Sequence, residues 1–291
     1  MDGATMKLRL AALLAIGPCT LVLAVACGGS DYVDPPSPGS LDDAALDGTG
    51  RRDGDPSDAA TGDGSSDADG ADLDGGADAL SGNVPQLGAA KSFAVLGGQT
   101  VTNSGAGTTI GGNLGVSPGS TVTGIPVGQP MGTTHLGADA LVVQAQLDLT
   151  KLYDDLKGRA CPAANVLTGQ NLAGKTLLPG VYCFASSAAI GVGTLFLDAD
   201  NDPNAYWVFQ IGSTLDVAAS TVTVIKGGTP CNIFWQVGSS ATVLNNALLA
   251  GNVVAFSDIS LNTGAAVTGR ALARNGSVTL LSNQISKAVC P

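Results

Sequence analysis

The sequence predicts a mainly β protein in which short strands stack as coils of a solenoid, with one long helix beside them. Similar segments recur near the C-terminus, and two of them open at Gly251 and Gly269, a period of 18 residues. Gly makes up 41 of 291 residues and aromatic residues only 4%, which suits tight, repeated β corners. A helical period is sustained only over residues 135–158.

Each C-terminal repeat contains a short stretch rich in hydroxyl and amide side chains. A single coil cannot bury its own apolar side, so neighbouring coils must stack, with equivalent residues about 4.7–4.9 Å apart. We therefore expect two exposed ladders along one face. The first contains Thr242, Ser260 and Thr279, and the second contains Asn245, Thr263 and Ser282. Because side chains alternate along a strand, Leu244 and Leu281 are expected to point inward.

The helix expected over residues 135–158 has an apolar stripe on one side. Leu141, Ala145, Leu149, Leu152 and Leu156 recur every three or four residues. Thr133 or Thr134 is expected to cap its N-terminus, and Gly158 to stop it. About 24 residues of helix span roughly 36 Å, the height of seven or eight stacked coils. The helix is therefore expected to lie along the wall of the solenoid.

The net charge of −11 is confined to one segment of the chain. Residues 28–82 contain 14 Asp with only Arg51 and Arg52, whereas residues 83–291 contain nine Asp and nine Lys or Arg. The acidic segment has almost no large apolar side chains, so we expect a disordered linker there. The remaining domain, 83–291, is neutral, which argues against nucleic acid as a partner.

The N-terminal residues 1–27 are typical of a lipoprotein-type signal peptide. Lys7 and Arg9 precede an apolar run that ends in small residues directly before Cys27. On this interpretation Cys27 is lipidated and anchors an exported protein to the bacterial cell envelope, at the outer membrane or cell surface. The alternative is an ordinary cleaved signal peptide followed by an unrelated cysteine.

Residue types that carry catalysis are scarce in this chain. It contains no Glu and one histidine, His135, and no carboxylate pair stands beside a candidate base. We expect no enzyme activity, no metal site and no cofactor. Cys161, Cys183, Cys231 and Cys290 are expected to form two disulfides in an exported protein. Three pairings are possible, and we favour Cys161–Cys183 with Cys231–Cys290 because each would tie neighbouring strand or coil ends.

Several stretches resemble the microbial ice-binding proteins, and together they extend over about residues 84–290. The stretches include Gly112–Gly119, Leu178–Tyr182, Phe234–Thr242 and Thr268–Gly276. The resemblance implies a right-handed, discontinuous and roughly triangular β-solenoid with one helix alongside, without cofactor or catalysis. It also implies that ice binds a flat face with repeats of Thr, a small residue, any residue, then Thr or Asn. Val243, Leu261 and Leu280 depart from that pattern at its second position.

Two functions remain open at this point. The first is ice binding by a monomer through the Thr, Ser and Asn ladders, either for adhesion of the cell to ice or for control of crystal growth. The second is a structural or adhesive surface lipoprotein that binds glycan or protein instead. A lipid anchor would be its only membrane contact. Thr side chains on exposed strands are also favoured by β-propensity alone, so the ladders do not decide between these functions.

Overall fold

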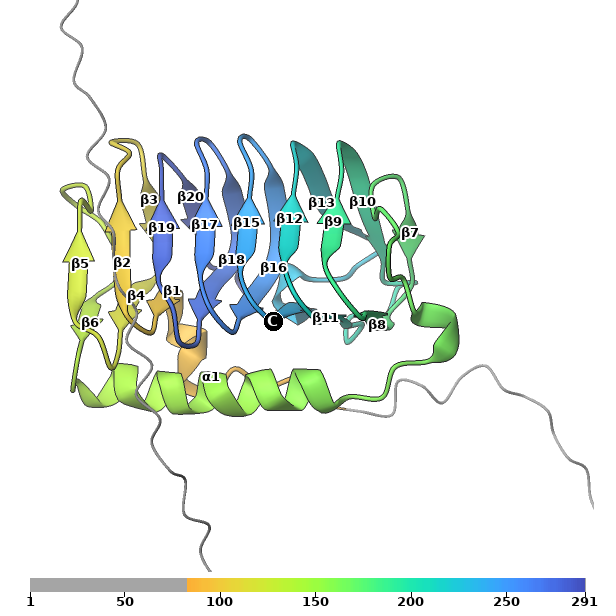
Figure 1. Cartoon of the computed structure of the whole chain (residues 1–291), viewed down its shortest axis with the longest axis horizontal. Helices are drawn as coiled ribbons and strands as arrows, with labels where there is room; N and C mark the ends of the chain where they lie inside the picture. Colours follow the sequence, from red (N-terminus) through yellow and green to blue (C-terminus); the bar gives the residue numbers. More distant parts are fainter. Residues whose placement is uncertain (1–82, 291) are drawn as a thin grey trace, which may run out of the picture. The chain divides into compact units, whose positions relative to one another are not determined.

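The computed structural model describes residues 83–290, and their strands pair in parallel to form a three-faced β-solenoid (Figure 1). A complete coil contributes one strand to each face. Two of the faces are joined into a 13-stranded sheet by the long strands β16 (Leu248–Ala255) and β18 (Ala266–Ala273). The third is a separate sheet of seven short strands, called here the seven-stranded face.

The strands divide among the faces as follows. The helix-side face contains β6 (Thr134–Leu136), β4 (Asn113–Val116), β1 (Phe93–Gly97), the second halves of β18 and β16, β14 (Ile233–Val237), β11 (Trp207–Ile211) and β8 (Gly180–Phe184). The seven-stranded face contains β5 (Thr121–Thr123), β2 (Thr100–Asn103), β19 (Val278–Leu280), β17 (Ile259–Leu261), β15 (Ala241–Val243), β12 (Leu215–Val217) and β9 (Ala188–Ile190). The remaining face, called here the third face, contains β3 (Thr109–Gly111), β20 (Gln284–Ser286), the first halves of β18 and β16, β13 (Ser220–Ile225), β10 (Gly193–Asp198) and β7 (Thr176–Leu177).

The solenoid is discontinuous because its two ends in sequence meet in the middle of the stack. The N-terminal strands β1, β2 and β3 pair with the C-terminal strands β18, β19 and β20. After β6 the chain runs along the stack as the helix α1 (Ala140–Gly158) and begins again at the opposite end with β7 and β8 (Figure 1). Three short 3-10 helices, η2 (Gly88–Ser92), η3 (Ala163–Asn165) and η4 (Pro230–Asn232), complete the connections.

The helix lies beside the solenoid as expected, but its predicted start is wrong. Residues 134–136 form strand β6, and Asp139 caps the helix by accepting the backbone N–H of Leu141 at 2.9 Å. Asp139 also lies 2.9 Å from Nδ1 of His135, which is a strand residue. The buried stripe contains Val142, Ala145, Leu149, Leu152, Tyr153 and Leu156, whereas Leu141 is exposed.

Two apolar cores hold the structure together. One fills the solenoid and includes a stack of aromatic rings in which Phe209 and Trp235 have centroids 4.0 Å apart. The other lies between α1 and the helix-side strands and includes Phe93, Phe234 and Leu272. Every coil is therefore backed by close-packed side chains, which keeps the outer faces rigid.

The 18-residue period corresponds to one coil. Gly251 and Gly269 are register partners at the bend where β16 and β18 pass from the third face to the helix-side face. Their φ angles are 111° and 152°, which side chains disfavour. A Cβ on Gly251 would lie 2.7 Å from the Cβ of Ile233, so a larger residue would strain this corner.

Disulfides join Cys161 to Cys183 and Cys231 to Cys290. The first ties the segment after α1 to β8, and the second ties the C-terminal segment to η4. The signal-peptide residues including Cys27 and the acidic segment 28–82 lie outside the described residues.

Candidate functional site

The predicted Thr and Ser residues lie in register on the seven-stranded face. Thr242 pairs with Ser260, and Ser260 with Thr279, on the adjacent strands β15, β17 and β19. The same row continues through Thr102 of β2 to Thr123 of β5. Five hydroxyl side chains on five neighbouring strands thus form one ladder, called here the hydroxyl ladder.

The hydroxyl ladder ends at β12 in the other direction. There the register partner of Thr242 is Asp216, and the next partner, on β9, is Ala189. Thr214 precedes Asp216 by two residues and therefore lies outside this row.

The outward row of Thr242, Ser260 and Thr279 is confirmed, but the residues expected to point inward were predicted incorrectly. Val243, Leu261 and Leu280 are 0%, 1% and 0% exposed, so they point into the solenoid and do not roughen the face. Leu244 and Leu281 are each 37% exposed and lie at its rim. A shift of one residue inverts the sides of a strand, and here two adjacent apolar residues made both assignments possible.

The second predicted ladder lies at a corner and not within the sheet. Asn245 and Thr263 are exposed turn residues that follow β15 and β17. Ser282 follows β19 in a loop of three residues, 281–283, whereas four residues occupy the equivalent loops 244–247 and 262–265. Its φ of 54° resembles that of Asn246, 60°, so Ser282 is not the strict equivalent of Asn245.

A second row of polar side chains precedes the hydroxyl ladder by two residues and was missed in the sequence. It contains Ser187, Thr214, Ser240, Asp258, Ser277, Thr100 and Thr121. Thr100 Oγ1 donates to Ser277 Oγ at 2.9 Å, and the Ser277 N–H donates to Asp258 Oδ1 at 2.7 Å. Hydrogen bonds thus link three members of this row, Thr100, Ser277 and Asp258.

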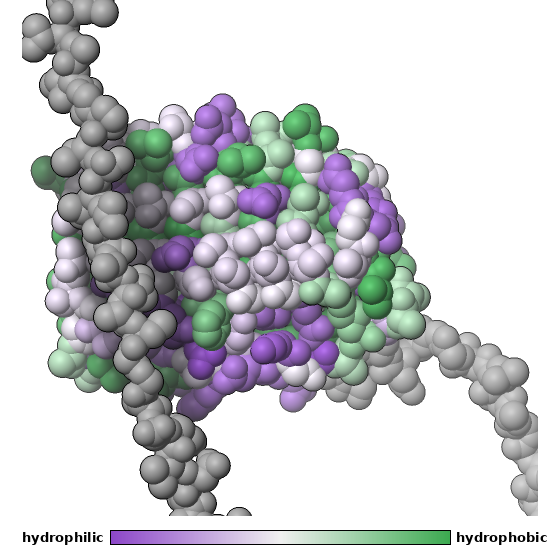
Figure 2. Space-filling view, in the orientation of Figure 1, coloured by the Kyte–Doolittle hydropathy of each residue, from purple (hydrophilic) through white to green (hydrophobic). Residues whose placement is uncertain are grey.

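The hydroxyl ladder differs from this second row in its hydrogen bonding. Within residues 83–290, none of its five hydroxyl groups has a side-chain or backbone partner. All five residues are exposed or half-buried. Figure 2 shows a pale band of side chains of intermediate hydropathy across the middle of this face. A hydroxyl both donates and accepts, so this row is free to order water.

The third face also lacks a covering helix but carries a different row. Its outward residues in register are Thr194, Thr221, Leu248, Ala266, Gln284 and Thr109. Leu248 is 49% exposed, and Phe196 on β10 is 37% exposed. Side chains of such different length cannot form a flat surface.

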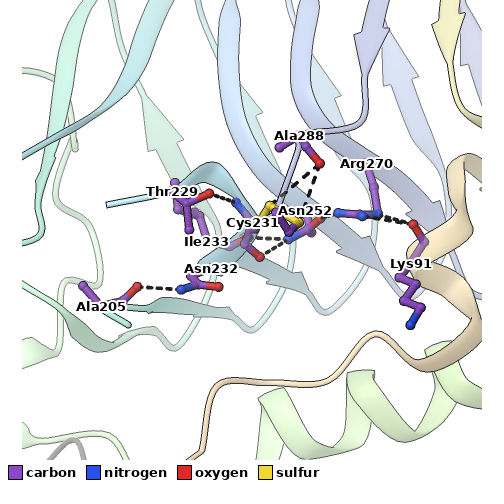
Figure 3. The surroundings of a disulfide bond; sticks show 10 residues. Lys91, Ala205, Thr229, Cys231, Asn232, Ile233, Asn252, Arg270 and Ala288 are labelled. Atoms are coloured by element: carbon purple, nitrogen blue, oxygen red, sulfur yellow. Dashed lines mark hydrogen bonds between the residues drawn. A yellow bond between two sulfur atoms is a disulfide. The ribbon is translucent and has the colours of Figure 1, made fainter. Parts of the chain in front are cut away.

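A buried polar cluster stabilises the corner between the third face and the helix-side face (Figure 3). The Asn252 amide donates to the backbone oxygens of Cys231 and Ile233 at 3.0 Å each and accepts from Arg270 Nη1 at 2.8 Å. Arg270 Nη2 donates to the Lys91 carbonyl at 3.0 Å, which ties the N-terminal segment to the C-terminal coils. Burial lowers the pKa of the Arg270 guanidinium to about 10.

Other kinds of site find little support within residues 83–290. No group of three or more His, Cys, Asp or Glu residues there could hold a metal ion. Asp198, the last residue of β10, has its Oδ2 2.7 Å from Lys226 Nζ, and this hydrogen bond lowers the pKa of the carboxyl. None of the helices in this part of the chain is long and apolar enough to span a membrane.

Comparison with known proteins agrees with this geometry. Residues 95–286 match the model of the family described as ice-binding-like. An ice-binding protein from Nostoc sp. (strain HG1) is 45% identical over 212 residues, which cover 72% of this chain and 77% of the relative. The chain belongs to the ice-binding-like family. The resemblance noted in the sequence is thereby confirmed for nearly the whole described domain.

Further members of the ice-binding-like family match in sequence and in structure. Ice-binding protein 1 of Shewanella frigidimarina (strain NCIMB 400) is 30% identical over 233 residues, which cover 70% of this chain but only 26% of that longer relative. A crystal structure of an ice-binding protein from an Antarctic biological consortium superposes with a TM-score of 0.66 at 40% identity. That match covers 72% of this chain and 93% of the other.

Proposed function

We propose that this protein binds ice through the seven-stranded face and acts without catalysis. The observation that carries the proposal is the hydroxyl ladder: five neighbouring strands present Thr or Ser in register, and their hydroxyls are not hydrogen-bonded within residues 83–290. Family membership supports the same function, since the relatives described above are named ice-binding proteins.

The proposed mechanism is a match between two regular arrays. Rungs of the ladder repeat at about 4.7–4.9 Å between strands, and alternate residues of one strand repeat at about 6.6–6.8 Å. Thr and Ser hydroxyls at these repeats order water in a layer that merges with the crystal, while the Thr methyl groups contact its surface. The packed interior fixes the array before binding, so little conformational entropy is lost.

The test is partitioning of the recombinant domain into a slowly grown ice hemisphere. We expect Ser260→Tyr to abolish partitioning, because a large ring on β17, the central strand of the seven, separates the flat face from the crystal. Thr268→Tyr is the matched control, since Thr268 is exposed on the third face. The free energy of unfolding of both variants should lie within about 0.5 kcal/mol of the wild-type value, as is usual for exposed substitutions.

The outcomes of this experiment show which of the two faces binds ice. Loss of partitioning in Ser260→Tyr alone supports ice binding through the seven-stranded face. Loss in Thr268→Tyr alone would place the activity on the third face. A wild-type domain that stays in the liquid would refute ice binding and favour the alternative, an adhesive surface lipoprotein.

We further propose that the protein is exported and held at the cell envelope by a lipid on Cys27. The support is the sequence pattern before Cys27, which lies outside the described residues, and the acidic segment that would separate the domain from the membrane. Cys27→Ser should move the full-length protein from the detergent phase to the aqueous phase. Unchanged partitioning of this variant would contradict lipidation at Cys27.

A further inference from the structure

We infer that ice contact is concentrated on the part of the seven-stranded face between β15 and β5, and that Asp216 is the residue that ends it. The inference rests on the proposed function and adds the extent of the binding surface. The face has seven strands, but only five of them carry a hydroxyl in the ladder. The strands at the other end, β12 and β9, carry Asp216 and Ala189 instead.

Asp216 differs in chemistry from every residue of the ladder. A hydroxyl donates and accepts hydrogen bonds, whereas an ionised carboxylate only accepts them. Water beside a carboxylate must therefore turn its hydrogens toward it, which conflicts with a lattice in which each water both donates and accepts. The Asp216 side chain is exposed and has no hydrogen bond or ion pair within residues 83–290, so bulk water solvates it. Covering it with ice would cost much of that solvation.

The other carboxylate on this face is held differently. Asp258 lies in the second polar row, and its Oδ1 accepts the Ser277 N–H at 2.7 Å. Its own backbone N–H donates to Ser240 Oγ at 3.3 Å. Part of the hydrogen-bonding capacity of Asp258 is therefore used within the protein. Asp258 helps to fix the second row, whereas Asp216 interrupts the first.

Charge along the chain agrees with this division. Residues 92–147 contain no Lys or Arg and a single carboxylate, Asp139, which caps α1 away from the face. This segment supplies β2 and β5, whose outward side chains on the face are Thr100, Thr102, Thr121 and Thr123. The uncharged end of the face is thus built from the N-terminal coils, which stack on β19.

The first test compares tyrosines at the two ends of one ladder. Thr123 and Ala189 occupy equivalent outward positions on the terminal strands β5 and β9, and both are exposed. We expect Thr123→Tyr to lose partitioning into ice and Ala189→Tyr to keep it. Equal loss in both variants would show that the whole face contacts ice and would overturn the inference.

The second test removes the interruption. Asp216→Thr extends the hydroxyl ladder by one rung that ice can cover without dehydrating a charge, so we expect its ratio of ice-bound to free protein to rise ~3-fold. Asp216→Glu keeps the charge and should show no gain. If the wild type partitions into ice and Asp216→Thr has the same ratio of ice-bound to free protein, only the role assigned to Asp216 is overturned. A wild type that does not partition refutes the proposed function itself.

Discussion

The two faces without a covering helix are built by the same coils yet present different surfaces. On the seven-stranded face, five successive strands carry Thr or Ser in one row. In the corresponding row of the third face, only Thr194 and Thr221 are adjacent hydroxyl residues before Leu248 interrupts them. Both faces are underlain by one apolar core, so their rigidity is shared. The difference lies entirely in the outward side chains.

This difference indicates which property the solenoid supplies and which one the sequence adds. Stacked coils give any outward column a regular spacing of about 4.7–4.9 Å. A flat hydroxyl surface arises only where every coil places a short side chain at the same outward position. Phe196 and Leu248 break that condition on the third face, and Asp216 breaks it at one end of the seven-stranded face.

The largest expected effect on stability is found by comparing a buried residue of the seven-stranded face with a residue at its rim. Leu280 is fully buried, and Leu244 is 37% exposed. Leu280→Ala should lower the free energy of unfolding by about 2–5 kcal/mol, because it leaves a cavity in the core. Leu244→Ala should cost less than about 1 kcal/mol. Urea unfolding of the oxidised domain measures both changes.

Leu248→Ala on the third face is the control for this pair. Leu248 is 49% exposed, so its truncation should resemble that of Leu244. A larger loss in Leu244→Ala than in Leu280→Ala would mean that the inward and outward assignments of the face are reversed, and with them the hydroxyl ladder.

The local repeat could be predicted from the sequence because it depends on contacts between neighbouring coils. The period between Gly251 and Gly269, and the row of Thr242, Ser260 and Thr279, are each found in the structure. The sequence predicts less well which apolar residues of a coil point inward. Val243 and Leu244 are both apolar, so composition alone does not say which of them is buried.

The other two rungs of the hydroxyl ladder, Thr102 and Thr123, depend on a contact that is remote in sequence. Thr102 joins the row because β2 pairs with β19, across more than half of the chain. No repeat links the two segments, so nothing in the sequence indicates that Thr102 lies beside Thr279. The helix start was missed for a local reason: the Thr residues before it can cap a helix but also favour a strand, and β6 pairs with β4.

The smallest expected effect distinguishes the hydroxyl from the methyl group of a ladder residue. Thr279→Val keeps the shape of the side chain and removes only its ability to hydrogen-bond water. We expect partitioning into ice to fall but not to vanish, because four hydroxyls of the ladder and all of its methyl contacts remain.

Thr268→Val, on the third face, should leave partitioning unchanged. Since Val suits strands well, neither variant should unfold more readily than the wild type in the same urea titration. Full partitioning of Thr279→Val would mean that shape and methyl contacts suffice at this rung. The comparison between the two faces would then rest on flatness, and hydrogen bonding from the ladder would not be required.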